Sequence, residues 1–208
     1  MMEEIKNNSK NIGVIILAAG ASSRMGSPKQ LLMYAGKTLL QHSIQAALGS
    51  IARPVIVVLG AHEDAIKTNL ENGNVQVVIN AAWQEGLASS IRYGINALVD
   101  TAPFTEATVL MVCDQPNVTA LLLNDLIKTQ QASSKPIVAS SYNGILGVPA
   151  LFHQSIFPEL LKLKGDVGAR FIIQEHIHET ETIAFSKGNI DIDTETDYRQ
   201  LYKDNYKA

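Results

Sequence analysis

The chain of 208 residues is 46% hydrophobic and carries a formal net charge of −3. This size suits one α/β domain with a full core, and no stretch approaches the ~20 apolar residues of a membrane span. The weak negative charge argues against a general nucleic-acid binder, and the single cysteine, Cys113, excludes an internal disulfide and a CxxC metal site. The polar segment Met1–Lys10 lacks the apolar core of a signal peptide, so we expect a short tail on a cytoplasmic protein.

Apolar runs alternate with helical patterns through the first part of the chain. Continuous apolar runs are typical of strands buried on both faces of a parallel sheet, and they occur at Ile12–Ala18, Val55–Leu59, Val75–Ile79 and Thr108–Cys113. Helices are expected over Thr38–Leu48, Glu63–Leu70, Leu87–Val99 and Thr119–Thr129, and the segment Lys29–Gly36 is expected to turn the chain. Thr38 and Thr119 are the expected helix caps. The alternation predicts an α/β fold with a mostly parallel central sheet and helices on both faces.

The pattern loosens in the second half. Extended structure is expected at Pro136–Ser141, Gly147–Phe152 and Thr182–Phe185, with a turn at 142–144. Helices are expected over Ser155–Leu163, over Asp166–His178 and from Thr194 onward, where Asp197 completes a variant capping box. Because no linker or repeat interrupts the chain, we expect one domain over residues 1–208. Its N-terminal half would bind a nucleotide, and residues 136–190 would form the acceptor side.

The first predicted strand stops abruptly at Gly20 and leads into a loop of small residues with two cations, Arg24 and Lys29. Small side chains let backbone N–H groups converge on an anion, and Gly20 and Gly26 can take a positive φ. Arg24 and Lys29 add the opposite charge. The loop therefore predicts a cradle for a polyphosphate.

Spacing excludes the two common phosphate loops. The run Gly20-Ala21-Ser22 breaks the dinucleotide fingerprint G-x-G-x-x-G, and in Walker A the lysine follows the second glycine directly, whereas Ser27-Pro28 intervenes before Lys29. The surroundings nevertheless favour a polyanionic ligand, because no Asp or Glu occurs from Ile5 to His62.

Asp114 follows the fourth predicted strand. Ligands of open α/β sheets bind at the carboxyl ends of strands, so this carboxylate is expected beside the loop after the first strand, where it could hold Mg²⁺ on a triphosphate. Alternation puts Asp191 and Asp193 on one side of an extended segment, as candidates to share the metal, while Asp197 better suits a helix cap. Purely structural roles as turn residues remain open for Asp114 and for this acidic segment.

The run from Leu17 to Lys29 closely resembles L-A-A-G-x-S-x-R-M-G-x-x-K, the signature of nucleotidyltransferases with a Rossmann-like fold. Within that group it is most similar to the molybdenum cofactor cytidylyltransferases, and the likeness extends from Ile12 to about Tyr198, through Asp-Gln-Pro at Asp114 and D-I-D-T-x-x-D from Asp191. It implies a Rossmann-like three-layer fold, catalytic roles for Lys29, Arg24 and Asp114, and a metal held by Asp114 and Asp193. The nucleotide-binding residues that it implies are Leu17, Ala18, Ala19, Gly20, Ser22, Ser23, Arg24, Gly26, Lys29, Asn80, Gly86 and Ser90.

Two further motifs carry the resemblance on the acceptor side. They are G-x-P-A-L-F at Gly147–Phe152 and G-D-x-G-A-R at Gly165–Arg170. From the residues alone, the second motif is typical of a helix start with Asp166 as its N-cap. The resemblance implies contacts to the acceptor from Gly147, Pro149, Gly165, Asp166 and Arg170, with Arg170 facing an anionic group.

Three weaker candidates lie outside these motifs. Backbone N–H groups at the helix start after Gly86 could bind an anion. Trp83 could stack on a base, although a packing role is the commoner use of a half-buried tryptophan. His176 and His178 would share one side only in a strand, and their segment has a helical pattern, so we expect no metal site there.

The activity implied by the resemblance is Mg²⁺-dependent transfer of CMP from CTP to the phosphate of the molybdopterin cofactor, with release of pyrophosphate. A molybdenum hydroxylase would then receive the product, and neither nucleic acid nor membrane is an expected partner. Another NTP stays open, because the phosphate loop cannot select a base. A guanylyltransferase, or a sugar-phosphate or methylerythritol-phosphate nucleotidyltransferase of the same fold, is one alternative. A non-catalytic molybdenum cofactor carrier is another, against which Lys29, Asp114 and Asp193 argue.

Overall fold

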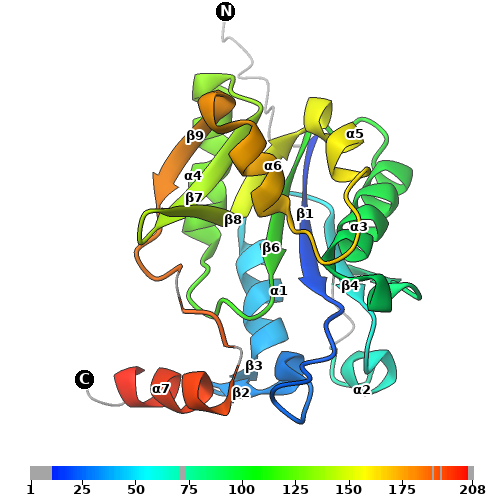
Figure 1. The fold of residues 1–208 in the computed structure, drawn as a ribbon, viewed down its shortest axis with the longest axis vertical. Coiled ribbons are helices and arrows are strands. Elements are labelled where there is room, and N and C mark those ends of the chain that lie inside the picture. Colours follow the sequence, from blue (N-terminus) through cyan, green and yellow to red (C-terminus); the bar gives the residue numbers. More distant parts are fainter. Residues whose placement is uncertain (1–10, 71–73, 189, 193, 206–208) are drawn as a thin grey trace, which may run out of the picture.

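The computed structural model describes residues 11–70, 74–188, 190–192 and 194–205 (Figure 1). The strands of its first half are β1 (Ile12–Ala18), β2 (Met33–Tyr34), β3 (Lys37–Thr38), β4 (Val55–Leu59), β5 (Gln76–Ile79) and β6 (Ala107–Val112). The helices and 3₁₀ turns of this half are η2 (Lys29–Leu31), α1 (Leu39–Gly49), α2 (Glu63–Lys67), η3 (Trp83–Glu85), α3 (Leu87–Thr101) and α4 (Ala120–Ser133).

The second half adds further strands to the same sheet and short helices to its faces. The strands are β7 (Ile137–Tyr142), β8 (Ile145–His153) and β9 (Thr180–Ala184). The helical elements are η4 (Gln154–Ile156), α5 (Phe157–Leu160), α6 (Ala169–Glu175), η5 (Ile177–Glu179) and α7 (Glu195–Asn205).

Within the described residues, seven strands form one sheet in the order β5-β4-β1-β6-β8-β7-β9, and β2 pairs with β3 in a separate hairpin. In this part of the chain only β8 runs antiparallel to its sheet neighbours, so the predicted, mostly parallel sheet is confirmed. Because β1, β4, β6 and β7 run in one direction, their carboxyl ends meet at one edge of the sheet, the lower edge in Figure 1. This edge is where ligands of open α/β sheets bind.

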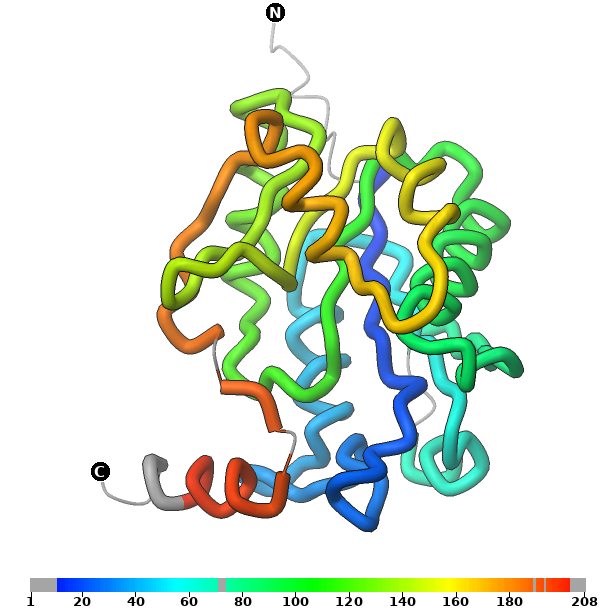
Figure 2. The backbone as a smooth tube through the Cα atoms, viewed as in Figure 1, coloured from blue at the N-terminus to red at the C-terminus, as the bar shows by residue number. Residues whose placement is uncertain are grey.

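Helices cover both faces of the sheet, as predicted (Figures 1 and 2). All residues of β1 are buried, and neighbouring side chains alternate between two cores: Ile16 packs with α1 and α4, and Ile15 packs with α3, α5 and α6. Each such side chain contributes about 1.5–3 kcal/mol on burial. The strand that precedes the glycine loop is thus buried along its whole length, which makes it a rigid base for that loop. Among the described helices, none combines the length and the apolar character needed to span a bilayer.

The helix caps predicted at Thr38, at Thr119 and at the start of the C-terminal helix are confirmed. The Thr38 side chain accepts a hydrogen bond from the Gln41 backbone N–H at 3.1 Å, and the Gln41 side chain accepts one from the Thr38 N–H at 2.8 Å. Thr119 caps α4 in the same way. At α7, Asp197 accepts from the Thr194 N–H at 2.8 Å, while the Thr194 hydroxyl accepts from the Asp197 N–H at 3.2 Å.

Several predicted boundaries were wrong. The helix expected over Glu63–Leu70 ends at Lys67, after which the chain continues in tight turns. The helix expected over Asp166–His178 forms only over Ala169–Glu175, because Gly168 and not Asp166 is its N-cap. A hairpin of β2 and β3 was not expected: β2 lies in the segment expected only to turn and β3 follows it directly, and two-residue strands are too short to show periodicity.

The C-terminal helix α7 packs on the β2–β3 hairpin rather than on the sheet (Figure 1). A small core joins Tyr34 of the hairpin to Ile192 and to Leu201 of α7. The hydroxyl groups of Tyr198 and Tyr202 both donate hydrogen bonds to the Met33 carbonyl. Burial, followed by the neighbouring Tyr202, raises the pKa of Tyr198 to about 12. These contacts hold the C-terminal segment at the carboxyl edge of the sheet.

Candidate active site at the carboxyl edge of the sheet

A cleft of about 510 Å³ opens at the carboxyl edge, between the loop after β1, the start of α3 and the end of β6. Its lining includes many of the predicted nucleotide-binding residues, namely Leu17, Ala18, Ala19, Gly20, Ser23, Arg24, Lys29, Gly86 and Ser90. Asp114 and Asp166 line it as well. The predicted residues that lie outside this lining are Ser22, Gly26 and Asn80. The sequence motifs therefore converge on one cavity from three separate elements.

Gln30 holds the glycine loop in shape. Its side chain is buried, and its Nε2 donates to the carbonyl oxygens of Ala18, at 2.8 Å, and of Gly20, at 2.9 Å. These bonds tie the end of β1 to the start of η2. They also satisfy two carbonyl groups of the loop segment. Sequence reasoning assigned no role to Gln30, although a polar residue directly after the loop lysine was a visible signal.

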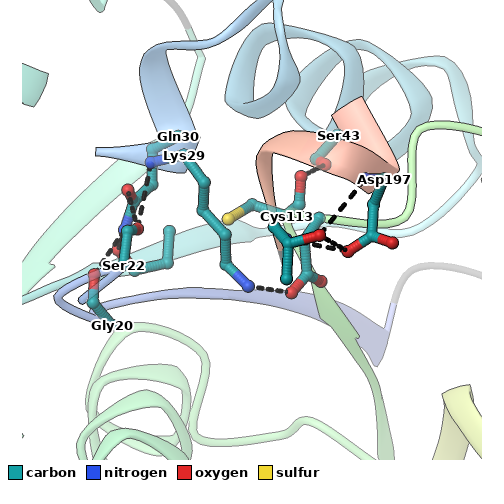
Figure 3. Close-up of polar contacts among 10 residues, drawn as sticks. Gly20, Ser22, Lys29, Gln30, Ser43, Cys113 and Asp197 are labelled. Carbon is teal, nitrogen blue, oxygen red and sulfur yellow. Dashed lines mark hydrogen bonds and ion pairs between the residues drawn. The ribbon is translucent and has the colours of Figure 1, made fainter. Parts of the chain in front are cut away.

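Ser22 also braces the loop from within. It adopts a positive φ of 54°, and its Oγ accepts a hydrogen bond from the Lys29 backbone N–H at 3.0 Å. Gly26 has a φ of 69°, which agrees with the conformational freedom expected of it. Figure 3 shows Ser22 and Gln30 on one side of Lys29, whose side chain extends away from the loop. Ser22 thus shapes the loop that presents Lys29.

Lys29 forms an ion pair with Asp114, which its Nζ contacts at Oδ2 (Figure 3). The pair joins the loop after β1 to the end of β6 across 85 positions of sequence. The other carboxylate oxygen, Asp114 Oδ1, is buried and accepts no hydrogen bond within the described part of the chain. A buried carboxylate oxygen without a donor is a fitting ligand for a divalent cation, because such a cation would compensate its lost solvation. Asp114 thus fits the metal-binding role expected of it.

The predicted second metal ligand, Asp193, lies outside the described residues. Its neighbourhood is partly defined, because the Ile192 backbone N–H donates to the Asp114 carbonyl at 3.1 Å and the Ile192 side chain is fully buried. Asp191 is exposed, and Asp197 serves as the α7 cap. Ile192, which directly precedes Asp193, is therefore held against Asp114 by a backbone hydrogen bond.

The N-terminus of α3 is closed by a loop from the second half of the chain. The Leu87 N–H donates to Asp166 Oδ1 at 3.3 Å, and the Ala88 N–H donates to the Gly165 carbonyl at 3.1 Å. Gly86 has a φ of 104°, and a Cβ atom there would lie 2.6 Å from the Gly165 carbonyl. Asp166 therefore caps α3 rather than its own helix, which corrects the expected N-cap. The N–H groups of Leu87 and Ala88 are likewise already paired and not open to an anion.

Asn80 lies beneath the cleft and organises its wall. The side chain is fully buried, and its Nδ2 donates to the hydroxyl groups of Ser89, at 2.8 Å, and Ser90, at 3.0 Å. Asn80 therefore positions Ser90, which does line the cleft. Trp83 is half-buried, packs against the α3-side core and also lines the cleft.

The predicted acceptor-side residues lie next to the cleft more often than inside it. Gly147 and Pro149 are buried in β8, and the Pro149 carbonyl accepts from the Ser140 hydroxyl at 2.6 Å. Arg170 is exposed on α6. Of this group, only Asp166 is part of the cleft lining. Gly147, Pro149 and Arg170 thus lie on β8 and α6, outside the lining of the cleft.

Two remaining sequence candidates have structural roles. Burial, together with the adjacent Asp114 carboxylate, raises the pKa of the Cys113 thiol to about 12, so this thiol is inert at neutral pH. His176 contacts Glu159 and Glu179, each at 2.8 Å, and these hydrogen bonds raise its pKa. It links α5 to α6 and η5.

Among the described residues, no group of three or more His, Cys, Asp and Glu side chains is arranged to hold a metal ion.

Comparison with known proteins places this site in a family. Residues 14–180 match the family model of the MobA-like NTP transferase domain. The chain is 28% identical over 201 residues to nicotine blue oxidoreductase from Paenarthrobacter nicotinovorans, covering 91% of this chain and 94% of that protein. It is 27% identical over 188 residues to molybdenum cofactor cytidylyltransferase from Escherichia coli strain K12, covering 90% of this chain and 93% of that protein.

Solved structures align with this chain over almost its whole length. The crystal structure of Rv0371c from Mycobacterium tuberculosis H37Rv aligns with a TM-score of 0.82 and 31% identity, covering 94% of this chain and 98% of that one. A complex of that protein with manganese aligns with a TM-score of 0.78 and 29% identity, covering 93% and 99% of the two chains. The likeness therefore includes the β8 and α6 side as well as the glycine loop.

Proposed function

The chain belongs to the MobA-like NTP transferase family and is a nucleotidyltransferase, and from this premise we propose that it transfers CMP from CTP to the phosphate of the molybdopterin cofactor, releasing pyrophosphate. One observation carries the proposal. It is the contact between Lys29 and Asp114 inside a cleft at the carboxyl edge, which joins the cation proposed to bind phosphate to the carboxylate proposed to bind the metal. The similarity to a molybdenum cofactor cytidylyltransferase along 90% of the chain supports this choice of substrates.

The glycine loop and its two cations hold the triphosphate in this proposal. Arg24 and Lys29 line the cleft, and Gln30 holds the loop by hydrogen bonds to its Ala18 and Gly20 carbonyl groups. Charge-assisted hydrogen bonds from such cations are about twice as strong as neutral ones. Lys29 also contacts Asp114, so it lies where the triphosphate and a metal would meet.

We propose that Asp114 and Asp193 hold one Mg²⁺ ion. Asp114 Oδ1 supports the first ligand, because it accepts no hydrogen bond from the described residues, and the Ile192 contact to the Asp114 carbonyl supports the second. When bound, the ion would neutralise negative charge that develops around the α-phosphate. The manganese complex of the mycobacterial relative agrees with a divalent ion in this family.

No general base is needed for the transfer. The acceptor phosphate is already ionised, so its oxygen forms the new bond to the α-phosphorus while the bond to the pyrophosphate oxygen breaks. Catalysis then depends on holding the two reactants in line and neutralising charge, which the cations of the loop can do. This agrees with a cleft that has an ion pair and no nucleophile–base pair among its described residues.

Selection of cytosine is proposed to come from hydrogen bonds to the edge of the base. Residues 17–20 and Ser90 line the cleft and could offer them, with Asn80 fixing the position of Ser90. A wrong base would leave such polar groups unpaired, which can give large discrimination. The acceptor would approach from the other side, along Gly147, Pro149, Gly165, Asp166 and Arg170, within the same single domain.

Turnover with purified molybdopterin cofactor and each of CTP, GTP and ATP tests the proposal, with pyrophosphate release and product mass as readouts. We expect CTP to have the highest kcat/KM and the product to be the cytosine dinucleotide. A preference for GTP would assign the guanylyl branch instead. Transfer only to a sugar phosphate would reject the pterin acceptor, and no pyrophosphate from any of these nucleotides would favour a carrier.

A further inference from the structure

We infer that Arg92 of α3 is a positioning residue, which clasps the loop between α5 and α6 onto the start of α3 and so fixes the acceptor contacts relative to the nucleotide. This acceptor loop, residues 161–168, carries Gly165 and Asp166, which the proposed function assigns to the acceptor. The inference rests on that proposed function and deepens it. Arg92 carries no role in the sequence motifs discussed above.

The Arg92 guanidinium joins two segments that lie far apart in sequence. Its Nη1 donates to the Leu163 carbonyl of the acceptor loop at 2.7 Å, across 71 positions. Its Nη2 forms an ion pair with Glu85 of η3. The Arg92 side chain is 25% exposed and that of Glu85 is 57% exposed. Because exposed ion pairs contribute little to stability, the bond to the Leu163 carbonyl is the arm of the clasp that holds the loop.

The acceptor loop meets the start of α3 at two further points, and Figure 1 shows it reaching down to that end of the helix. The Ala88 N–H donates to the Gly165 carbonyl at 3.1 Å, and the Leu87 N–H donates to Asp166 Oδ1 at 3.3 Å. Long side chains on a helix point back toward its N-terminus, so Arg92, one turn after Ala88, reaches the same loop. Because its donor is charged, the Arg92 bond is about twice as strong as these neutral donors would give.

The clasp lies beside the cleft and not inside it. Arg92 is absent from the cleft lining and instead lines a neighbouring groove, together with Glu85 and residues 161–165 of the acceptor loop. Asp166, further along the loop, does line the cleft. Arg92 therefore acts on the substrates only through the loop, by fixing where Asp166 lies.

The start of α3 has a second support that does not involve the loop. Asn80 donates to the hydroxyl groups of Ser89, at 2.8 Å, and Ser90, at 3.0 Å, and all three side chains are buried. The side of the cleft formed by Ser90 should therefore stay in place when the Arg92 clasp is removed. Transfer requires both substrates in one fixed arrangement, so a loosened loop should weaken acceptor binding more than nucleotide binding.

Hydrogen exchange in the free full-length protein tests the clasp without any substrate. Arg92→Met keeps an unbranched stem and a similar helix propensity, and it removes the guanidinium. We expect the Leu87 and Ala88 amides to exchange about tenfold faster, the effect of losing one hydrogen bond to a charged group. The amides of residues 95–99, later in α3, should exchange within about twofold of the wild type, because the opening is local.

Two control variants separate the arms of the clasp from a general loss of charge. Glu85→Gln removes the exposed ion pair and keeps the bond to Leu163, so it should change exchange at the start of α3 by no more than about threefold. Arg199→Met is the matched control, because Arg199 forms a surface ion pair with Glu195 within α7. It should leave exchange in α3 within about twofold of the wild type.

The functional readout compares the two substrates. We expect Arg92→Met to raise the KM for the molybdopterin acceptor about tenfold, and to leave the Kd for CTP, measured by calorimetry with Mg²⁺, within about twofold. Arg92→Lys keeps the charge but replaces the fork by a single ammonium group, which cannot span both partners. Its acceptor KM should therefore lie between those of the wild type and Arg92→Met.

Three results would overturn the inference. They are unchanged exchange at Leu87 and Ala88 in Arg92→Met, exchange that rises equally along the whole of α3, and faster exchange at the start of α3 with an unchanged acceptor KM or an equal loss for CTP. If the wild type transfers nothing from CTP, the proposed function fails, and the exchange measurement still decides whether Arg92 clasps the loop.

Discussion

Replacing Lys29 by methionine removes the ammonium group that contacts Asp114 and keeps most of the aliphatic stem. The two side chains are only 17% and 15% exposed, so solvent compensates the loss in part. After the substitution, Asp114 Oδ2 loses this contact, while Oδ1 already accepts no hydrogen bond from the described residues. The variant therefore perturbs both the folded protein and its affinity for a triphosphate.

The magnitudes of the two effects differ. Loss of a hydrogen bond between charged, partly buried groups destabilises a fold by about 1.5–3 kcal/mol. The effect on triphosphate binding should lie at the lower end of this range, about 1.5 kcal/mol or roughly tenfold in Kd, because in the wild type Lys29 must share its charge between Asp114 and the phosphates. The protein should remain folded.

The assay is a double-mutant cycle of Lys29→Met and Asp114→Asn. Urea denaturation gives the free energy of unfolding, and calorimetry with CTP and Mg²⁺ gives Kd. We expect a coupling energy of about 1–3 kcal/mol in stability, since the two residues form one ion pair. Lys37→Met is the control, because Lys37 is a lysine that bonds to Gln45 on the surface. Additive effects on stability, or an unchanged Kd for the folded Lys29→Met variant, would refute the reasoning.

Three further outcomes are expected. Asp114→Asn should lower kcat at saturating CTP by about a hundredfold or more, because this carboxylate acts on charge of the transition state, and a change in KM alone would contradict that role. Gly86→Ala should lower the free energy of unfolding by about 1–3 kcal/mol in urea denaturation, since φ is 104° and the new methyl group would meet Gly165. His176 has a pKa raised above its ordinary value of 6.5 by Glu159 and Glu179, so its charged form stabilises the fold below that value and the contribution is lost as pH rises through the raised pKa. The Tm difference between wild type and His176→Gln should therefore be larger near pH 5.5 than near pH 8.5, by about 1–3 °C, and a pH-independent difference would reject this role.

Local patterns were enough to predict the scaffold of the site. The boundaries of β1 and β4 follow from continuous apolar runs, and the Thr38 cap follows from short-range chemistry. Parallel strands then bring their carboxyl ends together, which is why the glycine loop and Asp114 share one cleft. These inferences needed only residues close in sequence and one topological rule.

Contacts between distant segments could not be predicted in the same way. Asp166 looked like the cap of its own helix, but it caps α3 across 79 positions, because the conformation of Gly86 admits the Gly165–Asp166 loop there. Nothing in the sequence around Asn80 indicates that its side chain bonds to Ser89 and Ser90 of α3. In each case a tertiary contact, rather than a local preference, decides the role.

The central claim is that this protein moves the α-phosphate of CTP onto an acceptor phosphate. The most direct test incubates the wild-type protein with CTP labelled at the α-phosphate, Mg²⁺ and purified molybdopterin cofactor, and follows the label. The account predicts that label appears in the pterin product with one equivalent of pyrophosphate, and that Lys29→Met slows its appearance. Label that stays in CTP, or that is released as free CMP without entering the pterin, would contradict the account.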